Sequence, residues 1–299
     1  MKFLLTGGTG LIGSALCRAL CAQGHQVTVL TRNQPRAQAI LGQDISLLTS
    51  LAQWTEDREF DGVINLAGEP IFDHAWSERQ KQVLLASRVD LTHHLVEHMA
   101  LQAVKPRYFL SGSAVGYYPD GNAPVGESHP PGTGFSSRLC VAWEQAALQA
   151  QSLSVPVTLL RTGLVLSATG GLLQRMVFPA RLGLGAVVGN GQQWMSWIHL
   201  EDYVQALLWM LQRAPVSGPY DMTAPEPVTN WEFMDHLCAQ VHRTCRFAIP
   251  AGLLRLGLGE RASLLTEGQR VIPERLLAEG FSFAYATLPA ALDHLLARS

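Results

Sequence analysis

The sequence predicts an α/β fold in which a doubly wound parallel sheet is followed by a smaller, mixed C-terminal lobe. Three observations support this prediction. Short apolar segments typical of buried strands alternate with helical segments over the first 165 residues, which is the pattern of a parallel sheet with helices on both faces. A glycine-rich turn follows the first apolar segment. After about residue 165 the alternation gives way to glycine-punctuated loops and shorter helices.

The first strand and its turn carry the most informative motif. The apolar run from Phe3 to Leu5 leads into Gly7, Gly10 and Gly13, and residues 14–22 continue with helical character. Glycines at this spacing allow a tight turn, a close approach of pyrophosphate to the backbone, and close packing of helix on strand. Backbone N–H groups at the helix start can then bind the phosphates. A glycine triplet between a strand and a helix predicts a dinucleotide site of the Rossmann type.

Two domains follow from this motif and from the change of pattern. We expect residues 1–165 to form the dinucleotide-binding domain and residues 166–299 to form a smaller substrate-binding lobe. Ligands should bind at the carboxyl ends of the strands, in the cleft that the second lobe covers.

The remaining elements are predicted from hydrophobic periodicity and from helix-stop and turn residues. Further strands are expected at residues 25–30, 45–48, 61–66, 107–110, 155–160 and 218–222. Helices are expected at residues 77–103, 135–151, 170–181, 202–212, 229–242 and 288–297. The long helix at 77–103 should turn one apolar stripe inward, formed by Val83, Leu84, Leu91, Leu95 and Met99.

The residues after the second strand indicate which dinucleotide binds. Thr31 and Arg32 stand where a dinucleotide fold holds the adenosine ribose. An acidic residue there would hold the ribose hydroxyls of NAD, whereas a basic residue suits the 2′-phosphate of NADP. Arg32 therefore favours NADP(H), and a solvated surface arginine is the alternative.

Composition narrows the class of protein. The 299 residues are 47% hydrophobic and 15% charged, with 22 Lys and Arg against 24 Asp and Glu, a net charge of −2. No basic run is present, which argues against nucleic-acid binding. The five cysteines are odd in number and contain no C-x-x-C pair, so we expect free thiols rather than disulfides or a zinc site. No signal-peptide pattern or membrane-spanning stretch occurs, which predicts a cytoplasmic protein without membrane association.

Several further segments share the pattern of one family. They are Asn65-Leu66-Ala67-Gly68-Glu69, Ser111 to Tyr118, Trp143-Glu144, Arg161-Thr162-Gly163, Trp197 to Asp202 and Gly268 to Pro273. With them the sequence resembles, over nearly its full length, an atypical extended short-chain dehydrogenase/reductase of the NAD(P)-dependent epimerase family. The resemblance implies a Rossmann domain, bound NADP(H), and a small carbonyl or sugar-nucleotide substrate. It leaves a homodimer open.

The resemblance also implies a set of cofactor contacts, carried over residue by residue. They are Gly7, Gly10, Leu11, Ile12, Gly13, Thr31, Arg32, Leu66, Ala67, Gly68, Arg88 and Leu164. Leu164 would line the nicotinamide side. No metal ligand is expected. His94 and His98 have metal-like i,i+4 spacing, but a polar helix face accounts for them.

The sequence departs from the family at the catalytic pair. The family uses Ser, Tyr and Lys, with Tyr and Lys spaced Y-x-x-x-K on one helix, and the ammonium lowers the pKa of the phenol. Here the Tyr position is Ser136 and the Lys position is Cys140, while Ser113 still matches the serine. We therefore expect Ser113 and Tyr117 to carry any catalysis. Tyr117 and its neighbour Tyr118 could equally be pocket lining only.

Other residues offer weaker alternatives. Cys140 could be a nucleophile, although a buried structural cysteine is commoner. His199 could donate a proton, although a histidine before a helix more often makes a polar contact at the helix start. Two functions remain open on the sequence alone: an NADP-dependent oxidoreductase or epimerase with altered chemistry, and a non-catalytic protein that senses NADP(H) and regulates a partner.

Overall fold

One parallel sheet forms the centre of the molecule. The structure, a computed structural model, describes residues 1–245 and 247–297. Its seven strands lie in the order β12-β7-β5-β4-β1-β2-β3, and every neighbouring pair is parallel. They are β1 (Lys2–Thr6), β2 (Gln26–Leu30), β3 (Ser46–Leu48), β4 (Gly62–Asn65), β5 (Tyr108–Ala114), β7 (Val157–Thr162) and β12 (Gly218–Met222). The predicted doubly wound Rossmann-type sheet is confirmed.

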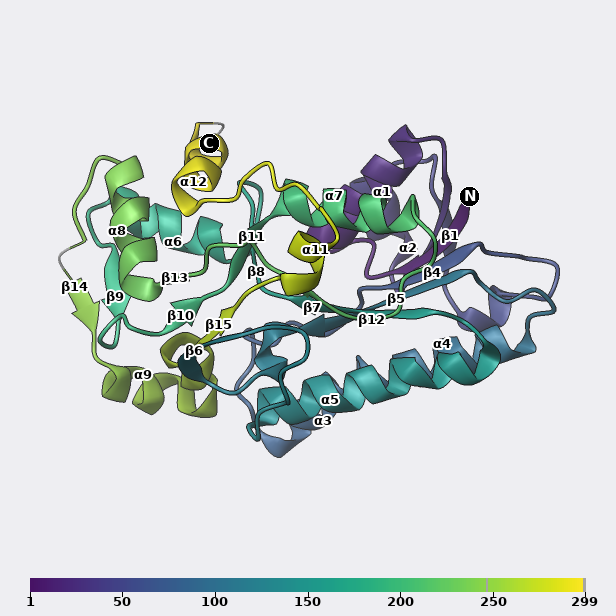
Figure 1. Cartoon of the computed structure of the whole chain (residues 1–299), viewed down its shortest axis with the longest axis horizontal. Coiled ribbons are helices and arrows are strands. Elements are labelled where there is room, and N and C mark those ends of the chain that lie inside the picture. Colours follow the sequence, from purple (N-terminus) through teal and green to yellow (C-terminus); the bar gives the residue numbers. More distant parts are fainter. Residues whose placement is uncertain (246, 298–299) are drawn as a thin grey trace.

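Helices cover both faces of this sheet. They are α1 (Leu11–Ala22), α2 (Gln34–Leu41), α3 (Glu78–Ala86), α4 (Val89–Leu101), α5 (Phe135–Leu148) and α7 (Leu200–Leu211). Figure 1 shows α1 and α7 on one face and α3, α4 and α5 on the other. Successive residues of a strand point to opposite faces, so Phe3 and Leu5 join a buried cluster with Leu16 of α1, whereas Leu4 joins a cluster with Leu95 of α4.

The second lobe is mixed, as expected. It contains β8 (Leu164–Leu166), α6 (Gly171–Arg181), β9 (Ala186–Val188), β10 (Trp194–Met195), β11 (Trp197–His199), β13 (Val228–Thr229), α8 (Asn230–Gln240), β14 (Phe247–Ile249), α9 (Ala251–Leu258), α10 (Ser263–Thr266), β15 (Gln269–Val271), α11 (Glu274–Ala278) and α12 (Leu288–Leu296). Its strands form small two-stranded sheets, and β15 pairs with β6 (Gly121–Val125) in the loop that follows β5.

After the first part of the second lobe, the chain contributes one more strand to the central sheet. Strand β12, predicted at residues 218–222, is an edge strand of that sheet and pairs with β7. Helix α7 packs against α1. The central layer therefore uses residues from both sides of position 165. The division into domains of residues 1–165 and 166–299 stays a prediction.

The helix predicted at residues 77–103 is two helices. The structure ends α3 at Ala86 and starts α4 at Val89. Ser87 accepts a hydrogen bond from the backbone N–H of Glu69 through its hydroxyl oxygen, at 3.1 Å. This contact fixes the break, where Arg88 donates to the Glu69 carbonyl oxygen at 2.9 Å. Val83 is 41% exposed, so its predicted place on the inward stripe is wrong.

Two cysteines are paired, against the prediction of free thiols. Cys238 and Cys245 form a disulfide, whereas Cys17, Cys21 and Cys140 are free. After α8 the chain turns through His242, whose φ is +56°, and this reversal brings the two Cα atoms within 5.9 Å. Gly185 makes room for the bridge, because a Cβ there would lie 2.6 Å from the Cys238 sulfur.

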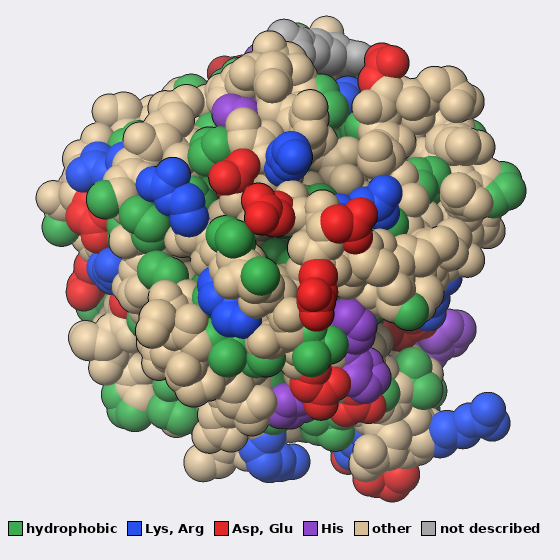
Figure 2. Space-filling model, turned by 90° about the vertical axis from the view of Figure 1, so that its right-hand side faces the viewer, with side chains coloured by type: hydrophobic (Ala, Val, Ile, Leu, Met, Phe, Trp, Pro, Cys, Tyr) green, Lys and Arg blue, Asp and Glu red, His purple; other side chains and the backbone are tan. Residues whose placement is uncertain are grey.

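The surface carries charges of both signs. On the face in Figure 2, Lys and Arg side chains are scattered among acidic side chains and do not form one continuous basic area. Within the described part of the chain, every helix is too short or too polar to cross a membrane.

Candidate cofactor and substrate site

The glycine turn after β1 has no room for a side chain at Gly7 or Gly13. Gly7 has φ of +71°, and a Cβ there would lie 2.6 Å from the carbonyl carbon and oxygen of Leu66 on the neighbouring strand end. A Cβ on Gly13 would collide with the Gly7 carbonyl oxygen. Only glycine fits these positions, so the turn lies against both β4 and α1.

Gly10 has an ordinary backbone conformation. Its φ of −79° is open to any residue. The left-handed conformation belongs to Gly7 instead. A Cβ on Gly10 would approach the Gly7 oxygen to 3.2 Å, a tight contact that a small shift relieves. Gly10 is the N-cap of α1 and has no side chain to cap it, so the first N–H groups of the helix remain available to an anion.

A small cavity of about 190 Å³ opens at this turn. It brings together six of the predicted cofactor residues, namely Gly7, Gly10, Leu11, Ile12, Gly13 and Leu66. Ser113 and Thr162, from β5 and β7, complete the wall at the carboxyl ends of the strands. The glycine cradle and the helix N-terminus have the shape and donor groups that a dinucleotide pyrophosphate requires.

The remaining predicted cofactor residues are not among the described residues that line this cavity. Arg32 is exposed directly after β2, which pairs with β1 up to Thr6. Thr31 receives a hydrogen bond on its hydroxyl oxygen from the Asn33 N–H at 3.2 Å, which shapes the same strand end. The Ala67 N–H donates to the hydroxyl oxygen of Thr6 at 3.2 Å. These contacts fix the backbone directly after β2 and after β4.

Arg88 points into the site from the break between α3 and α4. Its guanidinium donates to the carbonyl oxygen of Glu69 at 2.9 Å and lies 5.4 Å from the centre of the Trp143 ring. Gly68 allows this approach, since a Cβ there would be 2.9 Å from the guanidinium carbon. Burial lowers the pKa of Arg88 from its ordinary value, although Cys140 and Glu69 oppose that shift.

A much larger cavity, of about 1030 Å³, lies between the sheet and the second lobe. Arg88, Ser113 and Leu164 line it, as do Ser136 and Cys140, which stand where the sequence analysis expects the family's Tyr and Lys. Ser113 therefore faces both cavities. This is the cleft expected at the carboxyl ends of the strands.

Behind Ser113 lies a buried polar network that the sequence did not reveal. The Ser113 hydroxyl donates to Glu144 Oε1 at 2.7 Å. Arg161 holds the same carboxylate through two hydrogen bonds, from Nε to Oε1 at 2.8 Å and from Nη2 to Oε2 at 2.9 Å. Such bidentate pairs fix geometry as well as charge. The position of Ser113 is therefore set by α5 and β7 together.

The network continues to a second buried carboxyl group. Arg161 Nη1 donates to the Tyr118 hydroxyl at 2.9 Å, and that hydroxyl donates to Asp221 at 2.8 Å. Asp221 is fully buried on β12. Burial raises the pKa of Asp221 well above its ordinary value, and the neighbouring Glu127 carboxylate adds to the rise.

The two tyrosines after β5 occupy different environments. The Arg161 guanidinium carbon lies 3.5 Å from the centre of the Tyr117 ring. Tyr118 lines the large cavity, but Tyr117 is not among the described residues that line either cavity. Burial, and then the Asp221 charge, raise the pKa of the Tyr118 phenol, so this phenol stays protonated at neutral pH. The catalytic role of Tyr117 stays a prediction.

Cys140 has the character of a structural cysteine. Its thiol donates to the Ala114 carbonyl oxygen at 3.7 Å. Burial, with the nearby Glu144 charge, raises the pKa of this thiol to about 11. At neutral pH the group is a thiol rather than a thiolate, which disfavours the nucleophile alternative.

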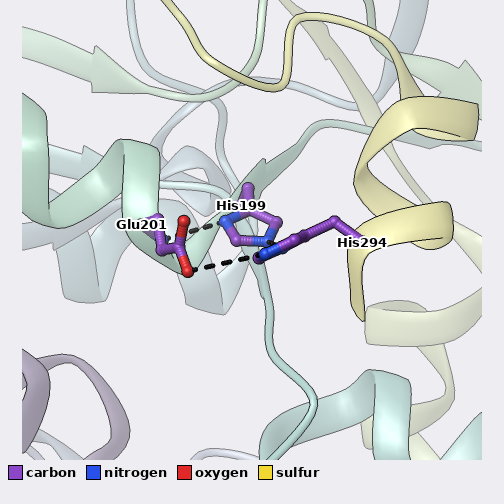
Figure 3. Close-up of side chains that lie close together, drawn as sticks. All are labelled: His199, Glu201 and His294. Atoms are coloured by element: carbon purple, nitrogen blue, oxygen red, sulfur yellow. Dashed lines mark hydrogen bonds and ion pairs between the residues drawn. The ribbon is translucent and has the colours of Figure 1, made fainter. Parts of the chain in front are cut away.

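Figure 3 shows a further cluster, formed by His199, Glu201 and His294. His199 Nδ1 accepts the backbone N–H of Glu201 at 3.0 Å, so His199 caps α7. A neutral His199 then carries its proton on Nε2, which faces His294 Nδ1 at 3.1 Å. The cluster ties α12 to the start of α7. The polar helix contact predicted for His199 is confirmed.

Comparison with known proteins places the chain in a class and then in a family. It has the doubly wound sheet and glycine turn of a dinucleotide-binding α/β protein. The model of the NAD dependent epimerase/dehydratase family matches residues 3–222, and a domain of unknown function, DUF1731, matches residues 249–295. The chain belongs to the NAD dependent epimerase/dehydratase family, which confirms the resemblance to extended short-chain dehydrogenases/reductases.

Relatives match over nearly the whole length. An epimerase family protein of Mycobacterium leprae is 39% identical over 98% of this chain and 95% of its own. One of Staphylococcus aureus is 33% identical over 99% of both. The structure of human epimerase family protein SDR39U1 (isoform 2) with NADPH has a TM-score of 0.90, at 31% identity and full coverage of both chains. A Thermus thermophilus UDP-glucose 4-epimerase shares the fold at a TM-score of 0.79 and 18% identity.

Proposed function

We propose that this chain binds NADP(H) at the glycine turn after β1 and acts as an oxidoreductase or epimerase-like enzyme on a carbonyl or sugar-nucleotide substrate. The observation that carries the proposal is the cradle formed by Gly7, Gly10 and Gly13. It leaves free helix N–H groups at a cavity with no side chain between the backbone and an anion. The human relative solved with NADPH supports the choice of cofactor.

The preference for NADP(H) over NAD(H) rests on Arg32. It follows β2 at the sheet edge where the adenosine ribose of a dinucleotide lies. Its exposed guanidinium can pair with a 2′-phosphate, and such charge-assisted contacts are strong. Leu164, Ala67 and Gly68 belong to the same proposed contact set.

Bound NADP(H) would supply the hydride chemistry. The protein's part is then to position the substrate and to exclude water. Ser113 faces both cavities, and because its proton is donated to Glu144, its oxygen can accept a hydrogen bond from a substrate hydroxyl. Tyr117 is proposed as the proton donor, in place of the phenol that the family carries at the position of Ser136.

Calorimetric titration tests the cofactor assignment. We expect the parent protein to bind NADPH more tightly than NADH, and Arg32→Asp to weaken NADPH binding by more than NADH binding. Arg107→Asp is the matched control, because Arg107 is an exposed arginine at the opposite end of the sheet. Equal affinity of the parent for both dinucleotides contradicts the proposal, as does an equal effect of the two substitutions.

A second candidate function is a regulatory protein that senses NADP(H). Ser136 and Cys140 at the Tyr and Lys positions favour it, because a hydroxyl and a neutral thiol cannot reproduce a phenol activated by an ammonium. Single-turnover oxidation of bound NADPH by carbonyl compounds separates the two functions. A cytoplasmic location and a homodimer also stay predictions, and sedimentation velocity tests the second.

A further inference from the structure

We propose that the large cavity takes a carbonyl compound with a large, uncharged, apolar body, rather than a sugar nucleotide. This inference rests on the proposed function, because it names the substrate of that same site. Three observations support it: the apolar character of most of the cavity wall, the pairing and sign of the charged groups on that wall, and the volume of the cavity.

Most of the wall beyond Ser113 is apolar, although polar side chains such as Gln193, Ser196 and Asn230 also line it. Side chains from three separate segments of the second lobe and from α5 face the space, among them Phe135, Leu172, Met176, Leu184, Met195 and Met234. Methionine and leucine side chains adapt to apolar ligands and offer no hydrogen bonds to sugar hydroxyls. Burial of apolar surface is the main favourable contribution that such a wall can make to binding.

Two arginines and two acidic residues line the described part of the cavity, so their charges balance. Arg175 pairs with Asp73 at 3.2 Å near the surface, and Arg88 donates to the Glu69 carbonyl oxygen. The other two charged lining residues, Asp120 and Glu267, are acidic and would repel a phosphate. A sugar nucleotide carries a pyrophosphate, which proteins hold with arginine, lysine or helix N-termini. Of the two arginines on the described lining, Arg175 is paired at the surface and Arg88 belongs to the proposed cofactor contacts, so neither is left for a second pyrophosphate.

The size and shape of the cavity suit a large substrate. Its volume of about 1030 Å³ is just above the roughly 300–1,000 Å³ typical of ligand pockets. Ser113, Trp143 and Thr162 line both this cavity and the small one at the glycine turn. A carbonyl group at Ser113 would therefore meet the cofactor side, while an apolar body extended toward α6 and α8.

Leu184 offers a sharp test because it combines exposure with a place on the wall. It is 56% exposed and lines the cavity. Leu182, two residues earlier, is 60% exposed and is not among the described lining residues. Arginine is tolerated at exposed positions, so both Leu184→Arg and Leu182→Arg should fold, and only the first places a guanidinium on the cavity wall.

The experiment is calorimetric titration of the full chain with NADPH first, and then, at saturating NADPH, with methyl undecyl ketone and with UDP-glucose. We expect the parent to bind the ketone more tightly than UDP-glucose. Leu184→Arg should weaken ketone binding about tenfold or more, which corresponds to about 1.4 kcal/mol. Leu182→Arg should leave ketone binding unchanged, and both variants should bind NADPH as the parent does.

The outcomes separate this inference from the proposed function. If NADPH itself does not bind, the proposed function fails. If NADPH binds but UDP-glucose binds more tightly than the ketone, the inference alone is overturned. No measurable ketone binding, or equal losses in Leu184→Arg and Leu182→Arg, overturns it as well.

Discussion

Replacing Glu144 by glutamine tests whether the buried network holds the site together. Glu144 and Arg161 have side chains only 7% and 4% exposed, and they share two hydrogen bonds of 2.8 and 2.9 Å. Glutamine keeps the shape but removes the charge, and its amide nitrogen cannot accept a hydrogen bond from Arg161. The change leaves a buried guanidinium with one of its two carboxylate acceptors gone.

The expected cost is large. Removing one partner of a buried ion pair typically costs about 3–5 kcal/mol, because the remaining charge is left uncompensated. The Ser113 hydroxyl, which donates to Glu144 at 2.7 Å, would also lose its charged acceptor. We therefore expect Glu144→Gln to lower the free energy of unfolding by about 3 kcal/mol or more.

Urea unfolding, extrapolated to water, measures this change. The matched control is Glu78→Gln, which makes the same substitution in an exposed pair with Lys81. Surface pairs contribute little, so the control should barely shift the unfolding curve. If Glu144→Gln destabilises no more than Glu78→Gln, the buried pair does not have the role assigned to it here.

Three further predictions concern the cofactor, catalysis and pH. Gly10→Val should weaken NADPH binding, measured by calorimetry, while the fold survives. Gly13→Ala should destabilise the fold, measured by thermal unfolding, because the added Cβ meets the Gly7 oxygen. Tyr117→Phe should slow single-turnover NADPH oxidation by about 10²–10⁴-fold with NADPH affinity unchanged, and an unchanged rate would exclude Tyr117 as proton donor. The pKa of Asp221 is raised in the folded state, so the folded protein keeps this proton to a higher pH than the unfolded chain does. The contribution of Asp221 to the free energy of unfolding is therefore full below about pH 4 and is lost as the pH rises toward the folded pKa. The loss is up to about 1.4 kcal/mol per pH unit. Asp221→Asn should flatten that decline in urea unfolding measured at successive pH values, and a parent-like slope would contradict the assignment.

Local patterns predicted most of the central sheet. Its strands are short apolar runs, and buried parallel strands have this signature regardless of their partners. The break in the helix at 77–103 escaped detection, because Ser87 and Arg88 are compatible with a helix. It is fixed by the contact of Ser87 with the Glu69 N–H, which is 18 positions away in sequence. The disulfide was missed for a related reason, since it depends on the left-handed turn at His242.

The candidate site was predictable where it depends on backbone geometry. The three glycines and the strand end at Leu66 meet at one cavity because the strand–turn–helix unit is local. The sequence shows Glu144 and Arg161 only as parts of motifs. Both are charged residues within otherwise apolar segments, which is a signal of buried pairing. Their partnership joins α5 to β7, and no local pattern specifies that contact.

Position 140 acquires a physical explanation from this partnership. Cys140 and Glu144 are four residues apart on α5 and so share one face of the helix. The positive charge that compensates Glu144 comes from Arg161 on β7, and the thiol at position 140 remains neutral. An ammonium at position 140 would bring a second cation to a carboxylate that already has one. A neutral side chain at position 140 therefore fits a polar centre formed by Glu144 and Arg161, with Ser113 as its contact with the cavity.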